Sequence, residues 1–507
     1  MPEYIDHPLI KPFTIERRLY QELILATAVK GNTLVVLPTG LGKTAIAIML
    51  SALRIEKYNG RVIFLAPTKP LCMQHCSTFQ KSLLFSAKEF SVITGEISPE
   101  KRRIRYGSRF IFTTPQTLLN DLLSNKTTLS DVCLIIFDEA HRATGRYPYV
   151  MLAKLYMQSA KNPLILALTA SPGDSSEKIE EIKKNLFIKY IEARDEKSFD
   201  VGPYIKRKKI KWVRITLPQE FKEVKRWLED ILREHLRTVK SLGAIESANL
   251  KEITKKDLLD LQKNITKEIA TNNANRVTYS AMVHVTACLK IYHALELLET
   301  QGVSALCKYL ERLEKQKSKA VKMLVEDVKF RSTMIKARYL SKKMEHPKLE
   351  KLKEIVESYL KRDKGSKIII FCQYRDSIDR IIGELKKIEN AKPVRFVGQA
   401  TRNDSRGMKQ KEQLEIINKF REGIYNILVA SSVAEEGLDI PEVNLVIFYE
   451  PVPSAIRSIQ RKGRTGRIAS GDIIILVTKE TRDEAYYWSA YYKERRMKEI
   501  LSQIAAY

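Results

Sequence analysis

The chain is poor in the residues and segments that mark secreted or membrane proteins. It has only six cysteines in 507 residues, scattered at positions 72, 76, 133, 288, 307 and 372, so we expect reduced thiols and no disulfide framework. Cys72 and Cys76 lack a second pair that would complete a metal site. No apolar run approaches the roughly 18 residues that span a bilayer, and the N-terminus lacks a signal-peptide layout. These absences predict a cytoplasmic protein without a membrane partner.

Acidic residues are also scarce relative to basic ones. Lys and Arg together number 88 against 60 Asp and Glu, which gives a net charge of +28. This excess favours a polyanionic partner, although a merely basic protein is an alternative that charge alone leaves open. Hydrophobic residues make up 44% of the chain. The length exceeds what one core supports, so we expect two or three domains.

Proline and glycine almost vanish from one long segment. Between Pro218 and Pro347 there is no proline, and glycine occurs only at 243 and 302, so we predict a helical insert over 203–346. The insert carries 31 Lys and Arg against 17 Asp and Glu, a net of +14. Either its basic runs contact phosphates or they are solvated helix faces. The candidate contacts are Lys206, Arg207, Lys208, Lys209, Lys315, Lys317 and Lys319.

Short apolar runs alternate with helix-like stretches on both sides of this insert. They lie at 34–37, 62–66, 91–94, 110–114, 134–137 and 164–168, and again at 368–371, 394–397, 427–430, 445–449 and 473–477. Such alternation predicts parallel βαβ units with ligand sites at the carboxyl ends of the strands. The predicted fold class is therefore α/β, with domains at 1–202 and 347–507 separated by an all-helical insert at 203–346.

A phosphate-binding pattern follows the first apolar run. It comprises Pro38, Thr39, Gly40, Leu41, Gly42, Lys43 and Thr44 and leads into a helix-like stretch. Backbone N–H groups at such a loop and helix start face anionic oxygens. We expect Lys43 to reach the β- and γ-phosphates and Thr44 to ligate Mg²⁺. Leu37 stands where the general pattern has glycine. A glycine turn before an ordinary helix is the alternative.

A second phosphate signature comes some 95 residues later, at the end of another apolar run. Asp138 suits a carboxylate linked to Mg²⁺, and Glu139 beside it suits the base that activates water. In the facing half, the segment 460–467 can present Arg464 and Arg467 together to a phosphate that is leaving. A basic loop for RNA or localisation is the alternative for these arginines. The combination predicts an enzyme that hydrolyses ATP with Mg²⁺.

With its motifs in this order, the chain resembles superfamily 2 helicases. The matching segments are 20–21, 38–44, 66–69, 94–96, 114–117, 138–141, 169–171, 368–374, 396–399, 434–441 and 460–467. The resemblance implies two RecA-like domains with ATP in the cleft between them. The stretches 448–460 and 482–488 are most similar to archaeal Hef helicases, which are related to FANCM. A helical insert is also shared by RIG-I-like RNA helicases.

The Hef resemblance implies ATP-driven action on branched DNA, such as forks and Holliday junctions, in replication-fork repair and recombination. The chain has no Glu-Arg-Lys nuclease signature, so cleavage is not implied, and a separate nuclease or replication clamp is an expected partner. We expect a cytoplasmic, nucleoid-associated protein. A RIG-I-like double-stranded RNA helicase is the second hypothesis. A non-enzymatic nucleic-acid scaffold is the third, and it predicts loss of catalytic residues that are all present here.

The same resemblance implies roles for further residues. Gln21 would read adenine, Gly437 and Asp439 would contact ribose, and Gln460 would face the γ-phosphate or the attacking water. Coupling between the phosphate site and the domain interface is implied for His141, Thr169 and Ser171. Nucleic-acid contacts are implied for Pro67, Thr68, Lys69, Gly95, Thr114 and Gln116, and in the second half for Gln373, Tyr374, Gly398 and Gln399. A strand that both domains hold can be moved when the cleft closes.

Overall fold

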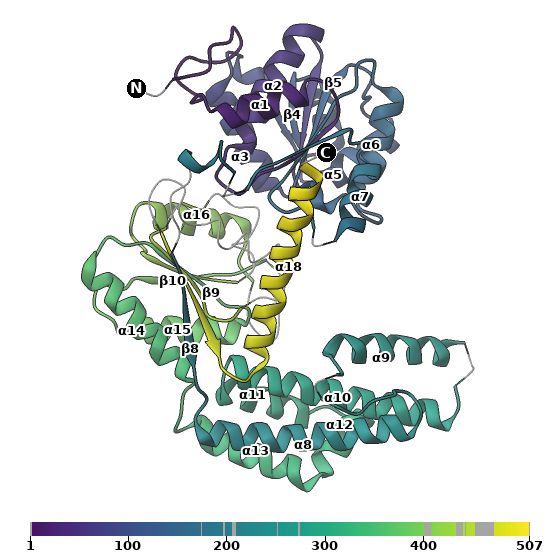
Figure 1. Cartoon of the computed structure of the whole chain (residues 1–507), viewed down its shortest axis with the longest axis vertical. Helices are drawn as coiled ribbons and strands as arrows, with labels where there is room; N and C mark the ends of the chain where they lie inside the picture. Colours follow the sequence, from purple (N-terminus) through teal and green to yellow (C-terminus); the bar gives the residue numbers. More distant parts are fainter. Residues whose placement is uncertain are drawn as a thin grey trace.

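The computed structural model places two sheet domains and a helical bundle along one axis (Figure 1). The structure describes residues 3–173, 175–195, 198–204, 209–250, 252–271, 274–399, 407–431, 440–441, 443–451 and 471–505. The first sheet lies at one end of the molecule, the second sheet in the middle and the bundle at the other end. This is the predicted class of two parallel sheets with a helical region between them in sequence.

The first sheet has the parallel strand order β3-β4-β2-β5-β6-β1-β7. Its strands are β1 (Thr33–Val36), β2 (Arg61–Leu65), β3 (Phe90–Ile93), β4 (Phe110–Thr113), β5 (Val132–Asp138), β6 (Ile165–Thr169) and β7 (Tyr190–Ala193). Successive residues of a strand point to opposite faces. Leu34 accordingly packs in the core on one face of the sheet and Val35 in the core on the other. Burial on both faces explains why these strands are continuous apolar runs.

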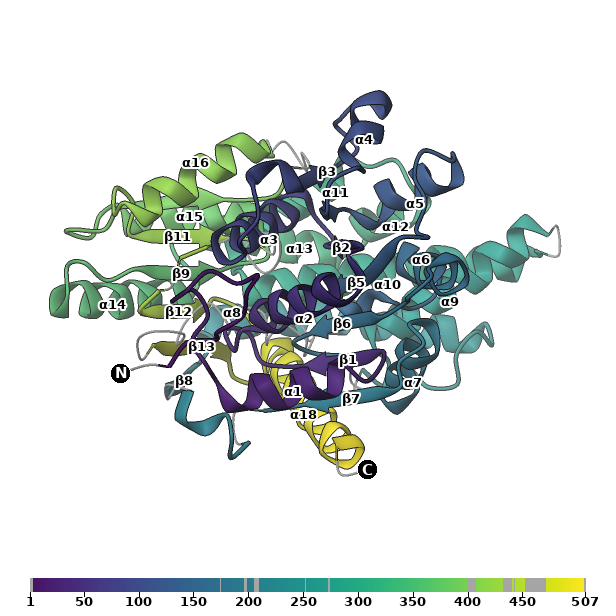
Figure 2. The ribbon, with the colours of Figure 1, turned by 90° about the horizontal axis from the view of Figure 1, so that it is seen from above.

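Helices cover both faces of the first sheet (Figure 2). They are α1 (Leu19–Ala28), α2 (Lys43–Tyr58), α3 (Lys69–Ser82), α4 (Pro99–Arg105), α5 (Pro115–Leu123), α6 (Pro148–Ser159) and α7 (Ser176–Asn185). Proline begins or follows the first residue of α3, α4, α5 and α6, where its missing N–H has no helical partner to lose. Helices α3 and α5 begin close behind the carboxyl ends of β2 and β4, where the motifs at 66–69 and 114–117 lie.

The second sheet has the order β10-β11-β9-β12-β13-β8. Its strands are β8 (Lys209–Ile215), β9 (Ile368–Phe371), β10 (Pro393–Phe396), β11 (Ile427–Ala430), β12 (Leu445–Phe448) and β13 (Asp472–Thr478), with helices α14 (Pro347–Arg362), α15 (Arg375–Leu385) and α16 (Gln410–Arg421). The segment expected to open an all-helical insert instead forms β8, which pairs in parallel with β13. Ile215 and Val213 pack into the core beneath this sheet, so the chain passes through the second sheet before it enters the bundle.

The bundle contains α8 (Gln219–Ser241), α9 (Lys255–Ala270), α10 (Arg276–Thr300), α11 (Val303–Glu314), α12 (Lys319–Glu326) and α13 (Val328–Ser341). Capping boxes at Thr254 and Asn275 satisfy the first backbone N–H groups of α9 and α10. Among the described helices, α10 alone is long and apolar enough to cross a membrane, but more than half of its apolar window is buried. A core helix passes the same test, and α10 packs against α8 and α9.

The C-terminal helix α18 (Arg482–Ala505) joins all three parts of the molecule (Figure 1). Its Tyr486 hydroxyl donates a 3.1 Å hydrogen bond to Glu296 of the bundle. Near its start, buried Asp483 pairs with buried Lys348 of α14. Further along, Met497 packs into the core of the first sheet domain. The helix is therefore held by the bundle, the second sheet and the first sheet in turn.

All six cysteines are buried and form no disulfide. Burial raises the pKa of the Cys72 thiol to about 12 and that of Cys76 to about 11. Cys133 packs in the core of the first sheet domain and Cys372 in that of the second. These cysteines act as small core residues.

Candidate active site and nucleic-acid interface

The phosphate loop connects β1 to α2, and two glycines make its bend. Gly40 and Gly42 have φ angles of 91° and 74°, in the left-handed region that favours glycine. A Cβ atom at Gly42 would lie 2.3 Å from the side-chain nitrogen of Gln21, so a larger residue does not fit there. Helix α2 begins at Lys43. The amino end of α2, where the helix dipole favours an anion, therefore lies next to the carboxyl end of β1.

Lys43 and Leu37 are joined across this loop. The Lys43 ammonium donates a 2.9 Å hydrogen bond to the Leu37 carbonyl oxygen. The Leu37 side chain is fully buried in the core of the domain. Leu37, which stands where the general pattern has glycine, therefore contributes to core packing. Gly40 and Gly42 make the bend of the loop.

Tyr20 and Gln21 of α1 hold the loop from the other side. The Tyr20 hydroxyl donates to the Leu41 carbonyl oxygen at 2.9 Å, and the Gln21 amide nitrogen donates to the same oxygen at 3.2 Å. Both side chains are buried. Adenine recognition by Gln21 stays a prediction. The structure adds a second task for this pair, which is to fix the backbone of the phosphate loop.

Asp138 ends β5 beside the loop and has a partner that the sequence motifs do not include. His75 of α3 is hydrogen-bonded to the Asp138 carboxylate at 3.0 Å, and its ring stacks on Phe64. Burial raises the pKa of Asp138, but the hydrogen bond and charge of His75 and the charge of Lys43 outweigh burial and lower that pKa below its usual range. Tyr149 holds the backbone of Asp138 by a 2.7 Å hydrogen bond to its carbonyl oxygen. Asp138 is thus a rigidly placed, ionised carboxylate.

A chain of contacts leads from Glu139 to α18. His141 lies 3.3 Å from the Glu139 carboxylate and 3.2 Å from the Thr169 hydroxyl. The Thr169 hydroxyl also donates to the Ser171 carbonyl oxygen and accepts from its backbone N–H, both at 3.1 Å. The Ser171 hydroxyl in turn lies 2.9 Å from the sulfur of Met497 on α18. The three residues expected to couple the phosphate site to its surroundings are therefore brought together.

The expected nucleic-acid contacts of the first domain lie at one edge of its sheet. They follow the carboxyl ends of β2, β3 and β4, which is the edge that also carries the phosphate loop. Lys69 forms an ion pair with Glu96, and the Gln116 amide donates to Asn120 at 2.9 Å. The Thr114 and Thr117 hydroxyls are 2.8 Å apart. Pro67 and Thr68 are half-buried and Gly95 is exposed.

The residues expected to contact nucleic acid in the second domain contact buried groups and the helical bundle. The backbone N–H of Gln373 donates to buried Glu450, which also accepts from Gln301 at the end of α10. Burial raises the pKa of Tyr374, and its ring lies 6.4 Å from that of His293 in the bundle. Two further residues, Gly398 and Gln399, follow β10 and are half-buried and exposed, respectively. This edge is built jointly by the second sheet and the bundle.

Part of the expected site lies outside the described residues. This holds for the expected ribose contacts Gly437 and Asp439, for Gln460, Arg464 and Arg467, and for the basic residues Lys206, Arg207 and Lys208. Lys209 belongs to β8 at the edge of the second sheet. By contrast, Lys315, Lys317 and Lys319 are exposed around the turn between α11 and α12.

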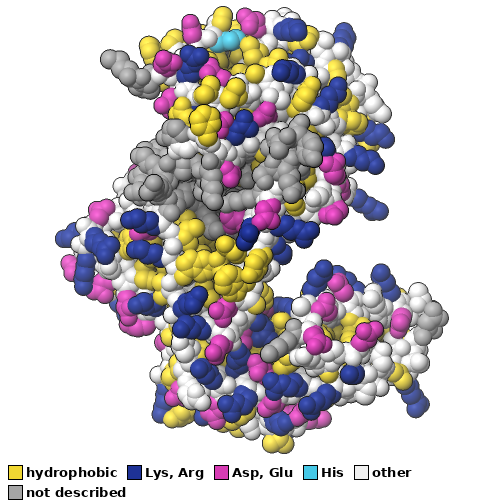
Figure 3. All heavy atoms as spheres, in the orientation of Figure 1, with side chains coloured by type: hydrophobic (Ala, Val, Ile, Leu, Met, Phe, Trp, Pro, Cys, Tyr) yellow, Lys and Arg dark blue, Asp and Glu magenta, His cyan; other side chains and the backbone are white. Residues whose placement is uncertain are grey.

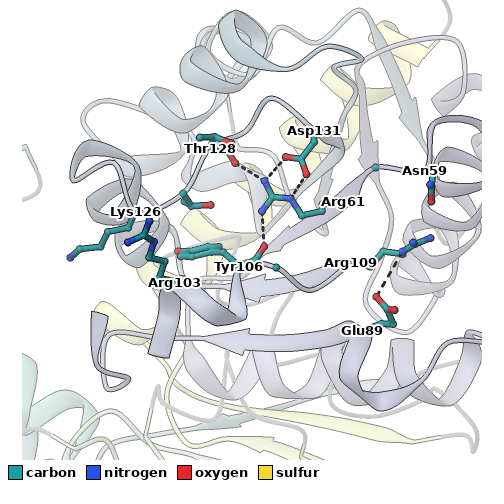
Figure 4. A pocket seen from close by; sticks show the side chains of 12 residues that line it. Asn59, Arg61, Glu89, Arg103, Tyr106, Arg109, Lys126, Thr128 and Asp131 are labelled. Carbon is teal, nitrogen blue, oxygen red and sulfur yellow. Dashed lines mark hydrogen bonds and ion pairs between the residues drawn. The ribbon is translucent and has the colours of Figure 1, made fainter. Parts of the chain in front are cut away.

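A separate basic hollow of about 510 Å³ lies at the amino ends of β2, β4 and β5, opposite the phosphate loop (Figure 4). The Arg61 guanidinium there is tied to the Asp131 carboxylate and to the Tyr106 and Thr128 carbonyl oxygens. Arg109 faces Glu89 at 3.8 Å. Arg61 therefore ties the start of β2 to the loops that precede β4 and β5, and this hollow is not part of the candidate active site.

Family models match three successive segments of the chain. Residues 18–179 match the DEAD/DEAH box helicase family, residues 220–345 a helical bundle named for ATP-dependent RNA helicases, and residues 347–469 the helicase conserved C-terminal domain. Together with the two parallel sheets, these matches define an ATP-dependent helicase of superfamily 2. The crystal structure of the Hef helicase domain of Pyrococcus furiosus is similar over 93% of this chain and 98% of that chain, with 47% sequence identity and a TM-score of 0.73. The chain belongs to the Hef helicase family.

Curated relatives are longer than this chain. A protein of Methanocaldococcus jannaschii named as an ATP-dependent RNA helicase is 42% identical over 503 residues, which are 99% of this chain and 63% of the relative. The ATP-dependent DNA helicase mph1 of Neurospora crassa is 35% identical over 92% of this chain and 41% of its own length. The DNA helicase Fancm of Drosophila melanogaster is 33% identical over 93% and 34%. The chain thus spans between about a third and two thirds of these relatives.

Proposed function

We propose that this protein is an ATP-driven DNA helicase and translocase that acts on branched DNA, such as forks and Holliday junctions, in fork repair and recombination. The proposal rests on one observation: Lys43, Asp138 and Glu139 lie close together at the carboxyl edge of the first sheet, next to the residues expected to contact a DNA strand. The relatives named as DNA helicases support DNA as the track. The similarity to Hef supports the branched substrate.

The residues of the first domain suit ATP hydrolysis. The N–H groups of residues 39–44 and the Lys43 ammonium would hold the β- and γ-phosphates, and Gln21 would lie near the base. Thr44 and ionised Asp138 offer the hard oxygen ligands that Mg²⁺ takes, so the donor set fits that ion. When bound, Mg²⁺ would neutralise charge on the phosphates. Glu139 would accept the proton of the attacking water. From the facing domain, the proposed contributors are Gln460, Arg464, Arg467, Gly437 and Asp439.

Movement along DNA would follow from closure of the two domains. Short polar side chains and N–H groups after β2, β3, β4, β9 and β10 suit phosphate contacts that ignore base sequence. If both sheet domains hold one strand, a closed state that binds ATP better shifts that strand by a small step. Lys315, Lys317 and Lys319 of the bundle would add contacts to the duplex. Lys209 lies on β8 and not in the bundle, so a contact of Lys209 with DNA would belong to the second sheet domain.

The division into 1–202, 203–346 and 347–507 is proposed to mark three working parts. The first would bind ATP, the second would grip nucleic acid, and the third would complete the ATP site. Because β8 pairs with β13, residues 209–215 would move with the third part. A nuclease or replication clamp as partner and a cytoplasmic, nucleoid-associated location are also proposals.

A double-stranded RNA helicase is the second candidate. The helical-bundle family and the relative from Methanocaldococcus jannaschii both carry RNA helicase names. ATP turnover should therefore be measured with single-stranded DNA, forked DNA, a Holliday junction and matched RNA at one salt concentration. We expect forked and junction DNA to stimulate turnover most. Stronger stimulation by RNA would replace the proposal with the second candidate, and no turnover with any nucleic acid would favour a non-enzymatic scaffold.

A further inference from the structure

Strand β8 forms an open edge of the second sheet. It pairs with β13 on one side, and within the described part of the chain no strand pairs with its other side (Figure 2). Its first four residues, 209–212, are exposed. An edge strand presents a row of backbone N–H and C=O groups that another extended chain can pair with. Proteins usually keep such edges short or covered, whereas this edge is seven residues long.

The two faces of β8 differ in chemistry. Successive side chains alternate between the faces, so Ile210, Trp212 and Arg214 lie on one face and Lys209, Lys211 and Val213 on the other. Ile210 is 43% exposed and Trp212 is 38% exposed. The described residues give the Lys209 and Lys211 side chains no ion pair and no hydrogen bond. The exposed part of this edge, residues 209–212, therefore offers two apolar side chains on one face and two unpaired cations on the other.

The apolar face of β8 opens into a hollow beside α18. The hollow measures about 380 Å³ and is lined mainly by the aromatic side chains Trp212, Tyr487, Trp488 and Tyr491, together with Arg214 and Val477. The ring of Trp212 stands edge-on to that of Tyr487, with centroids 3.6 Å apart. Trp488 and Tyr491 remain 41% and 43% exposed. Figure 3 shows hydrophobic side chains gathered on this face between the second sheet and α18. Exposed aromatic clusters of this kind mark interaction sites.

The open edge of β8 favours a peptide over nucleic acid, and the hollow offers a phosphate backbone no net attraction, because one cation, Arg214, and one anion, Glu484, line it. The Glu484 carboxylate accepts a 3.1 Å hydrogen bond from the backbone of Glu480. A phosphate backbone that stacked its bases here would pass close to this fixed negative charge. An extended peptide would avoid that conflict, because it can satisfy the open edge of β8 with its own main chain.

We infer that β8 is a docking edge for an extended acidic segment of a partner protein, which adds a strand to the second sheet. Side chains of an added strand lie beside those of β8 on the same face. Apolar side chains of the partner would lie beside Ile210 and Trp212 and enter the aromatic hollow. The alternate side chains would lie beside Lys209 and Lys211, where carboxylates pair with the cations. The recognised pattern is therefore apolar and acidic residues in strict alternation.

The test uses the full chain and a fluorescein-labelled peptide, Gly-Ser-Glu-Phe-Glu-Val-Glu-Ile-Gly-Ser, followed by fluorescence anisotropy. We expect saturable binding, and Trp488→Ala should weaken it about tenfold or more, as expected for a central aromatic contact. Tyr279→Ala, which removes an exposed aromatic ring on α10, is the matched control and should bind as the wild type does. A peptide of the same composition with its glutamates placed together should bind at least tenfold more weakly.

Two further measurements separate strand addition from other contacts. Lys211→Glu should lose the acidic peptide and gain a peptide in which lysine replaces each glutamate. Binding should also slow amide hydrogen exchange in residues 209–215, because the added strand pairs with their backbone. Equal binding of the two glutamate peptides would overturn the inference. So would displacement of the peptide by an oligo(dT) strand, which would assign the hollow to nucleic acid. Self-association of the wild type that Trp488→Ala abolishes would assign the edge to a second copy.

Discussion

The hydroxyl of Ser171 and the sulfur of Met497 lie 2.9 Å apart, although 326 residues separate them in sequence. Ser171 belongs to the chain of contacts that begins at Glu139 and passes through His141 and Thr169. Met497 belongs to α18, whose other end contacts the bundle and the second sheet. A change at the phosphate site therefore has a packed, continuous route to both other parts of the molecule.

Met497→Ala tests this route. Loss of a buried methionine should destabilise the packing of α18 against the first domain by about 2 kcal/mol or more. We expect ATP binding to be kept and the stimulation of turnover by DNA to fall several-fold, because the two sheet domains lose a shared anchor. Titrating forked DNA at saturating ATP measures the effect. Arg496→Ala changes an exposed residue of the same helix and serves as the control. Full stimulation in Met497→Ala would show that α18 is only a passive cover.

Lys43→Ala and Glu139→Gln should both remove most ATP turnover, for different reasons. The first substitution deletes the cation that holds the β- and γ-phosphates, so nucleotide binding should weaken as well. The second keeps the shape of the side chain but removes the base, so ATP binding should remain near that of the wild type. Equilibrium binding of a fluorescent ATP analogue, measured beside steady-state hydrolysis, distinguishes them. Near-normal hydrolysis by either variant would show that the site is assigned wrongly.

Much of the fold could be predicted from the sequence because its strands are buried on both faces. Every apolar run proposed as a strand coincides, within two residues, with one of the observed strands. The phosphate loop is equally visible, because Gly40 and Gly42 adopt the left-handed angles that the pattern requires. In both cases the local structure requires one type of residue, apolar side chains in the buried strands and glycine at left-handed backbone angles. Local demands of this kind can be recognised without knowing the rest of the chain.

The features that the sequence hides depend on distant partners. The sequence places strand β8 in a basic helical segment, because Lys209 and Lys211 make the charge more conspicuous than the alternation of Ile210 and Trp212. In the sequence, His75 looks like an ordinary residue on the buried face of α3. Its function becomes apparent only in the fold, where its ring is hydrogen-bonded to Asp138. The alternation is a usable signal for β8. For His75 the sequence holds no such signal.

His75→Ala should weaken the use of Mg²⁺ by this enzyme. Asp138 would lose the partner that fixes its carboxylate, and partners of this kind are worth roughly 10- to 100-fold in metal affinity or activity. We expect the Mg²⁺ concentration for half-maximal ATP turnover to rise by about that factor. His75→Gln should recover part of the loss, because an amide can still donate a hydrogen bond. Ser77→Ala, an exposed change on the same helix, is the control. An unaltered Mg²⁺ dependence would make His75 a packing residue.

Buried His346 should make the stability of the protein fall as the pH drops below neutral. Burial, aided by the charge of Lys348, lowers the pKa of His346 from 6.5 to about 3. Its Nδ1 accepts from the Lys348 backbone N–H, and its Nε2 lies 3.1 Å from the Glu299 carbonyl oxygen. Since Nδ1 accepts, the ring is neutral and carries its proton on Nε2. Between pH 6.5 and 3 the unfolded chain therefore binds a proton that the folded chain does not.

By linkage, the free energy of unfolding falls by up to about 1.4 kcal/mol for each pH unit in that window, and above pH 6.5 this group has no effect. His346→Asn can still cap α14 but does not titrate. We expect urea denaturation between pH 7 and pH 5 to show a smaller loss of stability in this variant. His235, whose pKa burial lowers to about 4, contributes with the same sign in both proteins. Parallel curves would show that His346 does not carry the effect.

The lysines around the turn between α11 and α12 give the clearest test of the bundle as a nucleic-acid grip. Lys315, Lys317 and Lys319 are exposed, so replacing all three by glutamine should leave the fold intact. If each lysine neutralises a phosphate of duplex DNA, the slope of log affinity against log salt should flatten by about 0.9 for every lysine replaced. ATP turnover at saturating DNA should largely survive, because the phosphate site is untouched.

The loss of affinity should be greater on forked than on single-stranded DNA, because only the fork offers a duplex to grip. Replacing Lys57, Lys88 and Lys161 by glutamine removes the same charge from exposed positions that precede β2, β3 and β6, away from the expected strand contacts. Fork binding over a range of salt concentrations therefore separates a local interaction from the overall charge of +28. If both triple variants flatten the slope equally, the lysines act only through net charge. An unchanged slope in the first variant would make the turn a solvated surface and leave duplex binding to other parts of the bundle.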